Sequence, residues 1–276
     1  MTTPTRRLRI LGLLFVALLA QSAAGDSLRD RIAGKISDDK RLLISVTPED
    51  EIKIGKQVSA NLLGVAPLVK DDGLQRYVNT VGRWVALQSE RPDLPWRFGV
   101  IESADVNAFA APGGYILITR GLYASLSEEA ELAGVLGHEI THVVERHHIE
   151  LLRKGTLIEE GRKALEKRMN DDKDETLRRL VGSGAELFAR GLDKGAEFEA
   201  DRRGVVLAAR AGYSPYGLPA VLQKIASVAK SDDRVQLLFK THPLPEERLR
   251  ALANSMGTQY DRYDRPGAGG TLYPLR

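Results

Sequence analysis

The segment His138-Glu139-Ile140-Thr141-His142 carries the pattern H-E-x-x-H and decides how the rest of the chain is interpreted. Apolar residues flank it at helical spacing, so we predict a helix that Ser127 caps and that ends near His148. Residues i and i+4 share one face of a helix, and both imidazoles can therefore reach the same metal ion. Glu139 would then lie beside a water molecule on that metal, where a carboxylate can act as a general base.

A catalytic zinc ion needs three protein ligands and one open position, and a chain without Cys must supply them from His and carboxylates. Glu197 is the predicted third ligand. In a helix over about 195–211 it shares a stripe with Asp201, and the small residues Ala200 and Gly204 on that stripe let two helices approach closely. Asp201 is then expected to accept a hydrogen bond from the free ring N–H of a ligating His.

Alternatives to these assignments stay open. Glu186 is a second candidate for the third ligand, and Asp201 can also be interpreted as the ion-pair partner of an Arg such as Arg202. His147 and His148 do not repeat the i+4 step of the motif. We interpret them as residues of the helix C-terminus, where the helix dipole favours an imidazolium.

The pattern along the chain predicts an α+β protein that is mainly helical, with a small sheet and a hairpin beside the H-E-x-x-H helix. Two scaffold helices precede the sheet, with apolar residues at helical spacing from Ile52 to Leu63 and from Leu74 to Val85. The triplet Pro112-Gly113-Gly114 favours a turn between the last two β segments. The expected strands lie at 96–101, 106–111 and 115–119, and further helices are expected at about 195–211, 216–230 and 245–254.

The charge balance excludes nucleic acid as a partner. The 276 residues hold 40 Lys+Arg and 37 Asp+Glu, but the first 25 contain Arg6, Arg7 and Arg9 and no acid, so the remainder is neutral. Phosphate binding needs a clustered surplus of Lys and Arg, which a neutral chain does not provide.

Residues 1–25 are predicted to be a secretory signal peptide, because three Arg precede the apolar run from Ile10 to Ala20 and small residues follow it. We expect cleavage after Ala24 and a periplasmic protein. The alternative is an uncleaved signal that anchors the protein in the inner membrane. The apolar run is about half the roughly 20 residues that a membrane-spanning helix needs.

Four motifs follow one another in the chain: Asn107-Ala-Phe-Ala-Ala-Pro-Gly-Gly, His138-Glu139-x-x-His142, Glu197-x-x-Ala200-Asp201, and Thr241-His242-Pro243 followed by Arg248. Together they resemble the CAAX prenyl endopeptidase-like zinc metallopeptidases, the family of the HtpX, BepA and Oma types. The resemblance covers roughly residues 48–252 and implies a gluzincin fold, endopeptidase activity and one Zn2+ per chain. We expect a soluble, secreted branch without the transmembrane helices of the HtpX type or the tetratricopeptide extension of BepA.

The resemblance also implies roles for two residues late in the matched region. In the family the counterpart of His242 lies at the zinc site and that of Arg248 near the substrate cleft, so with Glu139 they form the predicted catalytic set. Two active roles of His242 stay open: it stabilises the oxyanion of the tetrahedral intermediate, or it binds zinc as a fourth ligand and keeps the enzyme latent. A third interpretation is a helix-capping His without metal contact.

Substrate is expected to lie extended along an exposed strand of the hairpin, pairing through its backbone with the segment before the turn. The alternative is an ordinary hairpin without substrate contact. The predicted substrate-binding residues are Asn107, Ala108, Phe109, Ala110, Gly113 and Gly114.

The predicted domain organisation follows from these motifs. Residues 1–25 form the signal peptide, residues 26–256 the zinc metallopeptidase domain, and residues 257–276 a tail that contains Gly and Tyr. The segment from about 151 to 195 separates the metal helix from the third ligand, and we expect it to cover the cleft.

The sequence thus predicts a zinc-dependent endopeptidase that cleaves unfolded or misassembled envelope proteins by Glu-assisted attack of zinc-bound water. One alternative is a latched, zinc-stabilised periplasmic chaperone or adaptor with little proteolysis. A zinc amidase of the cell envelope is less favoured, because such an enzyme needs a surface that binds carbohydrate. Trp84 and Trp96 are the only Trp residues of the chain, and both fit the scaffold. The expected partners are polypeptide substrates, and the envelope membrane or its assembly machinery is a candidate for peripheral contact.

Overall fold

The computed structural model describes residues 46–153, 191–228, 232–264 and 270–275. The predicted signal peptide, Glu186 and most of the 151–195 segment lie outside these ranges. None of the helices within them combines the length and the apolar character that crossing a bilayer demands.

The two scaffold helices predicted before the sheet are present, and side chains fix where each begins. At the first, Thr47 Oγ1 accepts a hydrogen bond from the Asp50 N–H at 3.2 Å, and the Asp50 carboxylate accepts one from the Thr47 N–H at 3.1 Å. At the second, the Asp71 carboxylate accepts from the Leu74 N–H at 3.0 Å. Helical spacing of apolar residues therefore predicts both helices correctly. They are α3 (Pro48–Val65) and α4 (Asp72–Ala86).

Three strands form a small sheet: β1 (Arg97–Ile101), β2 (Ala108–Ala111) and β3 (Tyr115–Thr119). The strand order is β1-β3-β2, with β1 parallel to β3 and β2 antiparallel to it. The predicted hairpin joins β2 to β3, and its Gly113 and Gly114 have φ angles of 73° and 99°, a region that favours glycine. Two strands begin slightly later than predicted.

Side-chain amides of α4 fasten this helix to β1. Gln75 donates to the Val100 carbonyl and accepts from the Val100 N–H, each at 2.9 Å, and Asn79 accepts from the Phe98 N–H at 3.1 Å. The Val69 N–H also donates to the Val100 carbonyl at 2.9 Å. These bonds occupy the outer edge of β1. The other edge strand of this sheet is β2, at the end of the order β1-β3-β2.

Helices dominate the described chain after the sheet, as the sequence predicts for a mainly helical α+β fold. The helices expected at about 195–211, 216–230 and 245–254 are present with similar limits, whereas two short helices, one directly after the sheet and one before His242, are not predicted. The elements are α5 (Arg120–Ser125), α6 (Glu129–Val144), α10 (Lys194–Arg210), α11 (Gly217–Ser227), the 3-10 turn η2 (Asp233–Val235), α12 (Gln236–Thr241), α13 (Pro245–Met256) and the 3-10 turn η3 (Asp261–Tyr263).

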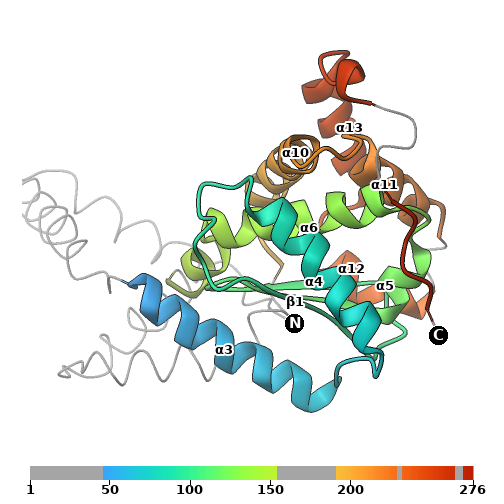
Figure 1. The fold of residues 1–276 in the computed structure, drawn as a ribbon. Helices are drawn as coiled ribbons and strands as arrows, with labels where there is room; N and C mark the ends of the chain where they lie inside the picture. The colour runs from blue at the N-terminus through green and yellow to red at the C-terminus, as the bar shows by residue number, and fades with distance from the viewer. Residues whose placement is uncertain (1–45, 154–190, 229–231, 265–269, 276) are drawn as a thin grey trace, which may run out of the picture. The chain divides into compact units, whose positions relative to one another are not determined.

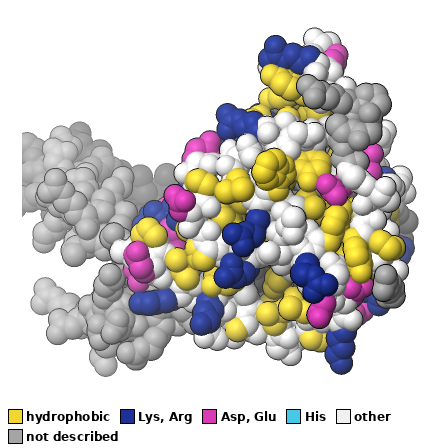
Figure 2. Space-filling view, in the orientation of Figure 1, with side chains coloured by type: hydrophobic (Ala, Val, Ile, Leu, Met, Phe, Trp, Pro, Cys, Tyr) yellow, Lys and Arg dark blue, Asp and Glu magenta, His cyan; other side chains and the backbone are white. Residues whose placement is uncertain are grey.

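Helix α6 carries the H-E-x-x-H motif and lies inside the fold. It contacts β2 and β3 of the sheet, and it also packs against α4, α10 and α11 (Figure 1). Nearly all of its residues are buried, including both motif His. In agreement with this burial, no His is visible on the face of the molecule shown in Figure 2. The sequence motif is therefore held in the core.

Both ends of α6 differ from the prediction. Ser127 does not cap the helix: Glu128 occupies the N-cap position without a side-chain bond, and the Ser127 N–H donates to the Glu131 carboxylate at 2.6 Å. The helix ends at Val144, earlier than expected, because Arg146 adopts a φ of 59° that an α-helix cannot continue through. The chain is helical again over 147–153.

A buried ion cluster holds the chain where α6 ends. Glu51, in the first turn of α3, has an almost fully buried side chain. Its carboxylate pairs with Arg91 at 2.9 Å and with Arg146 at 2.8 Å. Arg91 also donates to the Val143 carbonyl at 3.3 Å. Helix α3, the loop before β1 and the end of α6 are thereby joined at one carboxylate.

Replacing Glu51 by Gln should lower the free energy of unfolding by about 1–3 kcal/mol, because two guanidinium groups lose the charge that they share. The loss stays moderate because the Arg91 and Arg146 side chains are 21% and 36% exposed, so that water solvates part of their charge. Urea unfolding measures it. Glu49→Gln removes an exposed charge from the same helical turn and is the matched control. Equal free energies for the two variants would contradict the prediction.

Candidate active site

Helix α6 places His138 and His142 side by side, as the i+4 spacing predicts. Their Nε2 atoms lie 3.0 Å apart, and their rings meet edge to face. Both side chains are almost fully buried, and burial is the largest of the effects that lower the pKa of His142 well below its ordinary value. Two imidazoles whose Nε2 atoms converge in this way are suited to bind one metal cation.

Helix α10 brings the Glu197 carboxylate to the same point. Its Oε1 lies 3.6 Å from His142 Nε2, and its Oε2 lies 3.8 Å from His138 Nε2. Glu197 is fully buried, and Oε1 has no hydrogen-bond partner among the described residues. A buried carboxylate oxygen without a donor is unusual in a folded protein, and it fits a ligand that is a metal ion.

Two glycines make this approach of α10 to α6 possible. A Cβ at Gly137 would lie 2.6 Å from the Gly204 carbonyl oxygen, and a Cβ at Gly204 would lie 2.6 Å from the His138 nitrogen. Side chains larger than hydrogen would therefore push the helices apart. The expectation that small residues let these helices approach closely is confirmed, with Ala200 fully buried on the same stripe.

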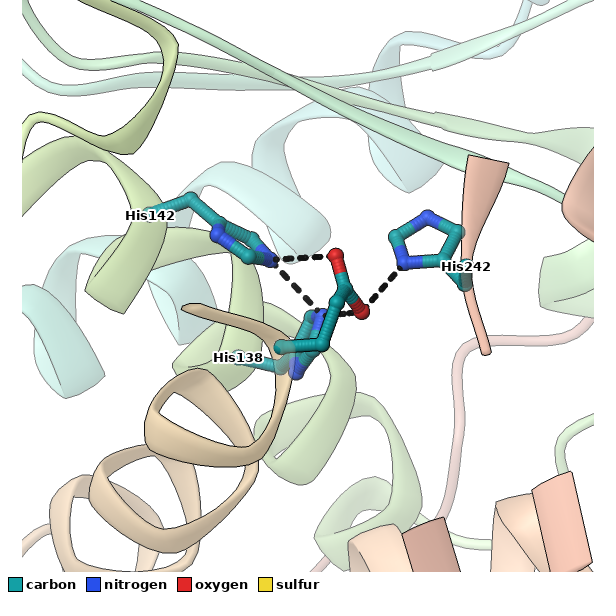
Figure 3. Close-up of side chains that lie close together, drawn as sticks. His138, His142 and His242 are labelled. Carbon is teal, nitrogen blue, oxygen red and sulfur yellow. Dashed lines mark hydrogen bonds and ion pairs between the residues drawn. The ribbon is translucent and has the colours of Figure 1, made fainter. Parts of the chain in front are cut away.

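His242 reaches the cluster from the junction between α12 and α13. Its Nδ1 lies 2.7 Å from Glu197 Oε2. Figure 3 shows three imidazoles around this carboxylate, with His242 on the side opposite His142. One potential ligand atom from each of these four residues lies within 4.8 Å of the others. Burial alone would raise the pKa of Glu197, but His242, His138 and Arg248 lower it to about 2, so the carboxylate is charged.

Asp201 lies one turn after Glu197 and contacts the other ring nitrogen of His138, at 2.9 Å from Nδ1. Its two oxygens also accept hydrogen bonds from the buried guanidinium of Arg248, at 2.5 and 2.9 Å. Asp201 thus has both partners considered from the sequence, a motif His and an Arg, but the Arg is Arg248 instead of Arg202. Burial alone would raise the pKa of Asp201, and Arg248 and His138 together hold it well below its usual range.

A cavity opens beside these residues and includes Glu139. Its lining contains Asn107, Ala108, Phe109 and Ala110 from the region of β2, together with His142, Glu197 and His242. Burial raises the pKa of Glu139 above the ordinary carboxyl value. Gly113 and Gly114 are not among the lining residues: the hairpin turn packs against the start of α3 and against Trp96. The structure therefore brings four of the six predicted substrate-binding residues to the cavity and leaves the two glycines outside it.

The interpretation of His147 and His148 as C-terminal helix residues is wrong, because α6 has already ended before them. His147 Nδ1 lies 2.9 Å from His142 Nδ1, and His148 lines the cavity. Burial lowers the pKa of His148 to about 4. The position of both rings depends on the backbone reversal at Arg146, and an Arg in the left-handed region has no clear sequence signal.

Comparisons with known proteins agree with this geometry. The sequence profile of peptidase family M48 matches residues 73–256. The beta-barrel assembly-enhancing protease of Escherichia coli (strain K12) is 30% identical over 215 residues, which are 75% of this chain and 44% of that protein. A mitochondrial metalloendopeptidase of Arabidopsis thaliana is 30% identical over 189 residues, 68% of this chain and 37% of that protein. Metalloprotease YcaL of Escherichia coli is 28% identical over 166 residues, 59% and 63% of the two chains.

Replacing Asp201 by Asn should lower zinc affinity by about 10- to 100-fold, because His138 loses the charged acceptor that orients its ring. We expect one zinc per wild-type chain and none in His138→Ala or Glu197→Ala. Metal analysis and titration against a chelator measure both effects. Asp72→Asn, an exposed change of the same type on α4, is the control. If Asp201→Asn bound zinc as tightly as the wild type, Asp201 would serve only as the partner of Arg248.

Proposed function

The chain belongs to peptidase family M48, and from this premise we propose that it is an endopeptidase that cleaves unfolded or misassembled envelope proteins. The family and the described His and Glu cluster agree on a zinc metallopeptidase domain. The single observation that carries the proposal is the juxtaposition of that cluster, the buried Glu139 and a cavity lined by an edge strand.

The substrate class is inferred from the relatives. The chain spans about 44% of the length of the beta-barrel assembly-enhancing protease, whose name ties that protein to barrel assembly. Unassembled barrel proteins expose unpaired strands, which is the form of substrate that an edge strand can bind. This supports envelope polypeptides as substrates and the assembly machinery as a peripheral partner. Removal of residues 1–25 would release the protein into the periplasm, and an uncleaved signal would anchor it.

The site residues suggest distinct roles. His138, His142 and Glu197 would hold zinc, and Asp201 would orient His138. Bound zinc supplies Lewis acidity, which lowers the pKa of a coordinated water and polarises the scissile carbonyl. Glu139 accepts the proton of the attacking water and passes it to the leaving amine. Its burial and raised pKa support this role, because they strengthen its affinity for a proton.

Strand β2 is the proposed platform for substrate. It is an edge strand of the described sheet, and its residues line the cavity beside Glu139. An extended peptide that pairs with it would lie across the site, with alternate side chains in pockets. Asn107, just before the strand, has a buried side-chain oxygen without a hydrogen-bond partner among the described residues. That oxygen is suited to accept a hydrogen bond from a substrate N–H.

One observation supports a second candidate function, a latched chaperone or adaptor with little proteolysis. His242 lies within hydrogen-bond distance of Glu197, so a zinc ion in this cluster would have four protein ligands within reach: His138, His142, Glu197 and His242. Sites with four protein ligands are structural and not catalytic. Wild type that suppresses aggregation of an unfolded protein but never degrades it would favour this function.

Replacing Glu139 by Gln should abolish cleavage of casein or of an unfolded periplasmic protein and leave zinc content unchanged, because the carboxylate acts on water and is not a ligand. Gel-based degradation assays and metal analysis measure the two effects. The exposed change Glu49→Gln controls for loss of one negative charge. Loss of zinc in Glu139→Gln would count against the role, and equal cleavage by wild type and variant would refute the peptidase proposal.

The two active roles of His242 predict opposite results for His242→Ala. If the ring restrains the site as a fourth ligand, basal proteolysis should rise. If it donates a hydrogen bond to the oxyanion, turnover should fall by about 100-fold or more, as for other removed oxyanion donors. The distance of 2.7 Å to Glu197 favours the restraint. Steady-state kinetics on a fluorogenic peptide distinguish the two, and an unchanged rate would contradict both.

A further inference from the structure

The chain reverses where α6 ends, and the reversal changes the neighbours of a proposed metal ligand. In a continuous α-helix, His147 would lie about 140° around the axis from His142 and roughly 7.5 Å further along it, so the two rings could not touch. In the structure, Arg146 takes the left-handed conformation and His147 folds back. Its Nδ1 lies 2.9 Å from His142 Nδ1, and the ring centroids are 5.1 Å apart.

The reversal is fixed from outside the helix. Arg146 pairs with the buried Glu51 carboxylate and donates to the Val46 carbonyl at 2.5 Å. Glu51 is in turn paired with Arg91, which donates to the Val143 carbonyl in the last turn of α6. A non-glycine residue persists in the left-handed region only where its surroundings hold it there. The ion cluster provides such surroundings.

The contacts of His142 assign its ring nitrogens. Its Nε2 faces the cluster, 3.0 Å from His138 Nε2 and 3.6 Å from Glu197 Oε1, so Nε2 would be the ligand atom and Nδ1 would carry the proton. That Nδ1 forms a hydrogen bond with His147 Nδ1. His147 must then accept through Nδ1 and carry its own proton on Nε2, which faces Glu199 Oε2 at 3.7 Å.

We propose that His147 is a positioning residue of the metal site, which accepts the Nδ1 proton of His142 and so fixes the tautomer and the orientation of that ligand. This inference rests on the proposed function only in taking His142 as a zinc ligand. The two motif His are then oriented by different groups: Asp201 holds His138 through a carboxylate, and His147 holds His142 through an imidazole. Ligating His residues generally need such a partner for their free ring nitrogen.

Two substitutions of nearly matched size separate the hydrogen bond from packing. Asn places its Oδ1 where His has Nδ1, so His147→Asn keeps an acceptor, whereas His147→Leu puts a methyl group there. We expect His147→Leu to weaken zinc binding by about 10- to 100-fold and His147→Asn to remain within about threefold of wild type. Chelator competition measures the affinities, and the visible spectrum of the cobalt-substituted protein should be altered only in the Leu variant.

Unfolding temperatures of the metal-free proteins show whether packing alone is affected. If Leu prevents folding, His147→Ala makes the same comparison with Asn. Wild-type zinc affinity in both variants, or an equal loss in both, would overturn the positioning role of His147. The proposed metal site would still stand in that case, because the wild type binds zinc. A wild type that binds no zinc would instead overturn the proposed function and this inference together. Glu199→Gln should change the affinity less than His147→Leu, because Glu199 contacts His147 and not the ligand. An equal loss would contradict the proposal, because the effect would then depend on the charge of Glu199 and not on the acceptor nitrogen of His147.

Discussion

The close crossing of α6 and α10 is the constraint on which the rest of the site depends. At Gly137 and Gly204 the two backbones are so near that an added Cβ on either would lie 2.6 Å from a backbone atom of the opposite helix. The crossing delivers Glu197 and Asp201, one turn apart, to the two ring nitrogens of His138. Helix α10 thus supplies one candidate ligand, Glu197, and the carboxylate of Asp201 that orients another, His138. Any separation of the helices would weaken both contacts at once.

Three carboxylates lie in the core around this crossing, and the pKa of Glu139 shifts in the direction opposite to that of Glu197 and Asp201. Asp201 is bonded to Arg248, and Glu197 is surrounded by imidazoles, so both carboxylates have lowered pKa values. Glu139 has cationic neighbours as well, but for it burial is the dominant effect and its pKa is raised. Neighbouring buried carboxylates thereby differ in their affinity for a proton: Glu197, proposed to bind the metal, and Asp201, proposed to orient His138, hold no proton, and Glu139 beside the cavity is able to take one.

The parts of the fold that are predictable from sequence are those set by local periodicity. Apolar spacing predicts α3 and α4, and the i+4 spacing predicts that His138 and His142 converge. The helix stripe that carries Glu197 likewise predicts its approach to the motif. The end of α6 is not predictable in this way, because Arg146 takes a left-handed conformation that its own preference disfavours. This conformation is held by the ion pair with Glu51, a residue far away in the sequence. The same holds for His147, whose contact with His142 depends on that turn.

The metal site also has consequences for the order in which the chain becomes functional. Its candidate ligands come from positions 138, 142, 197 and 242, so the cluster closes a long stretch of sequence. Such distant contacts form late, after the entropy of loop closure has been overcome. A chain synthesised only to residue 190 holds the two imidazoles of α6 but neither Glu197 nor His242. A nascent copy therefore lacks a complete metal site, and hydrolytic capacity would arise only after nearly the whole domain has been made.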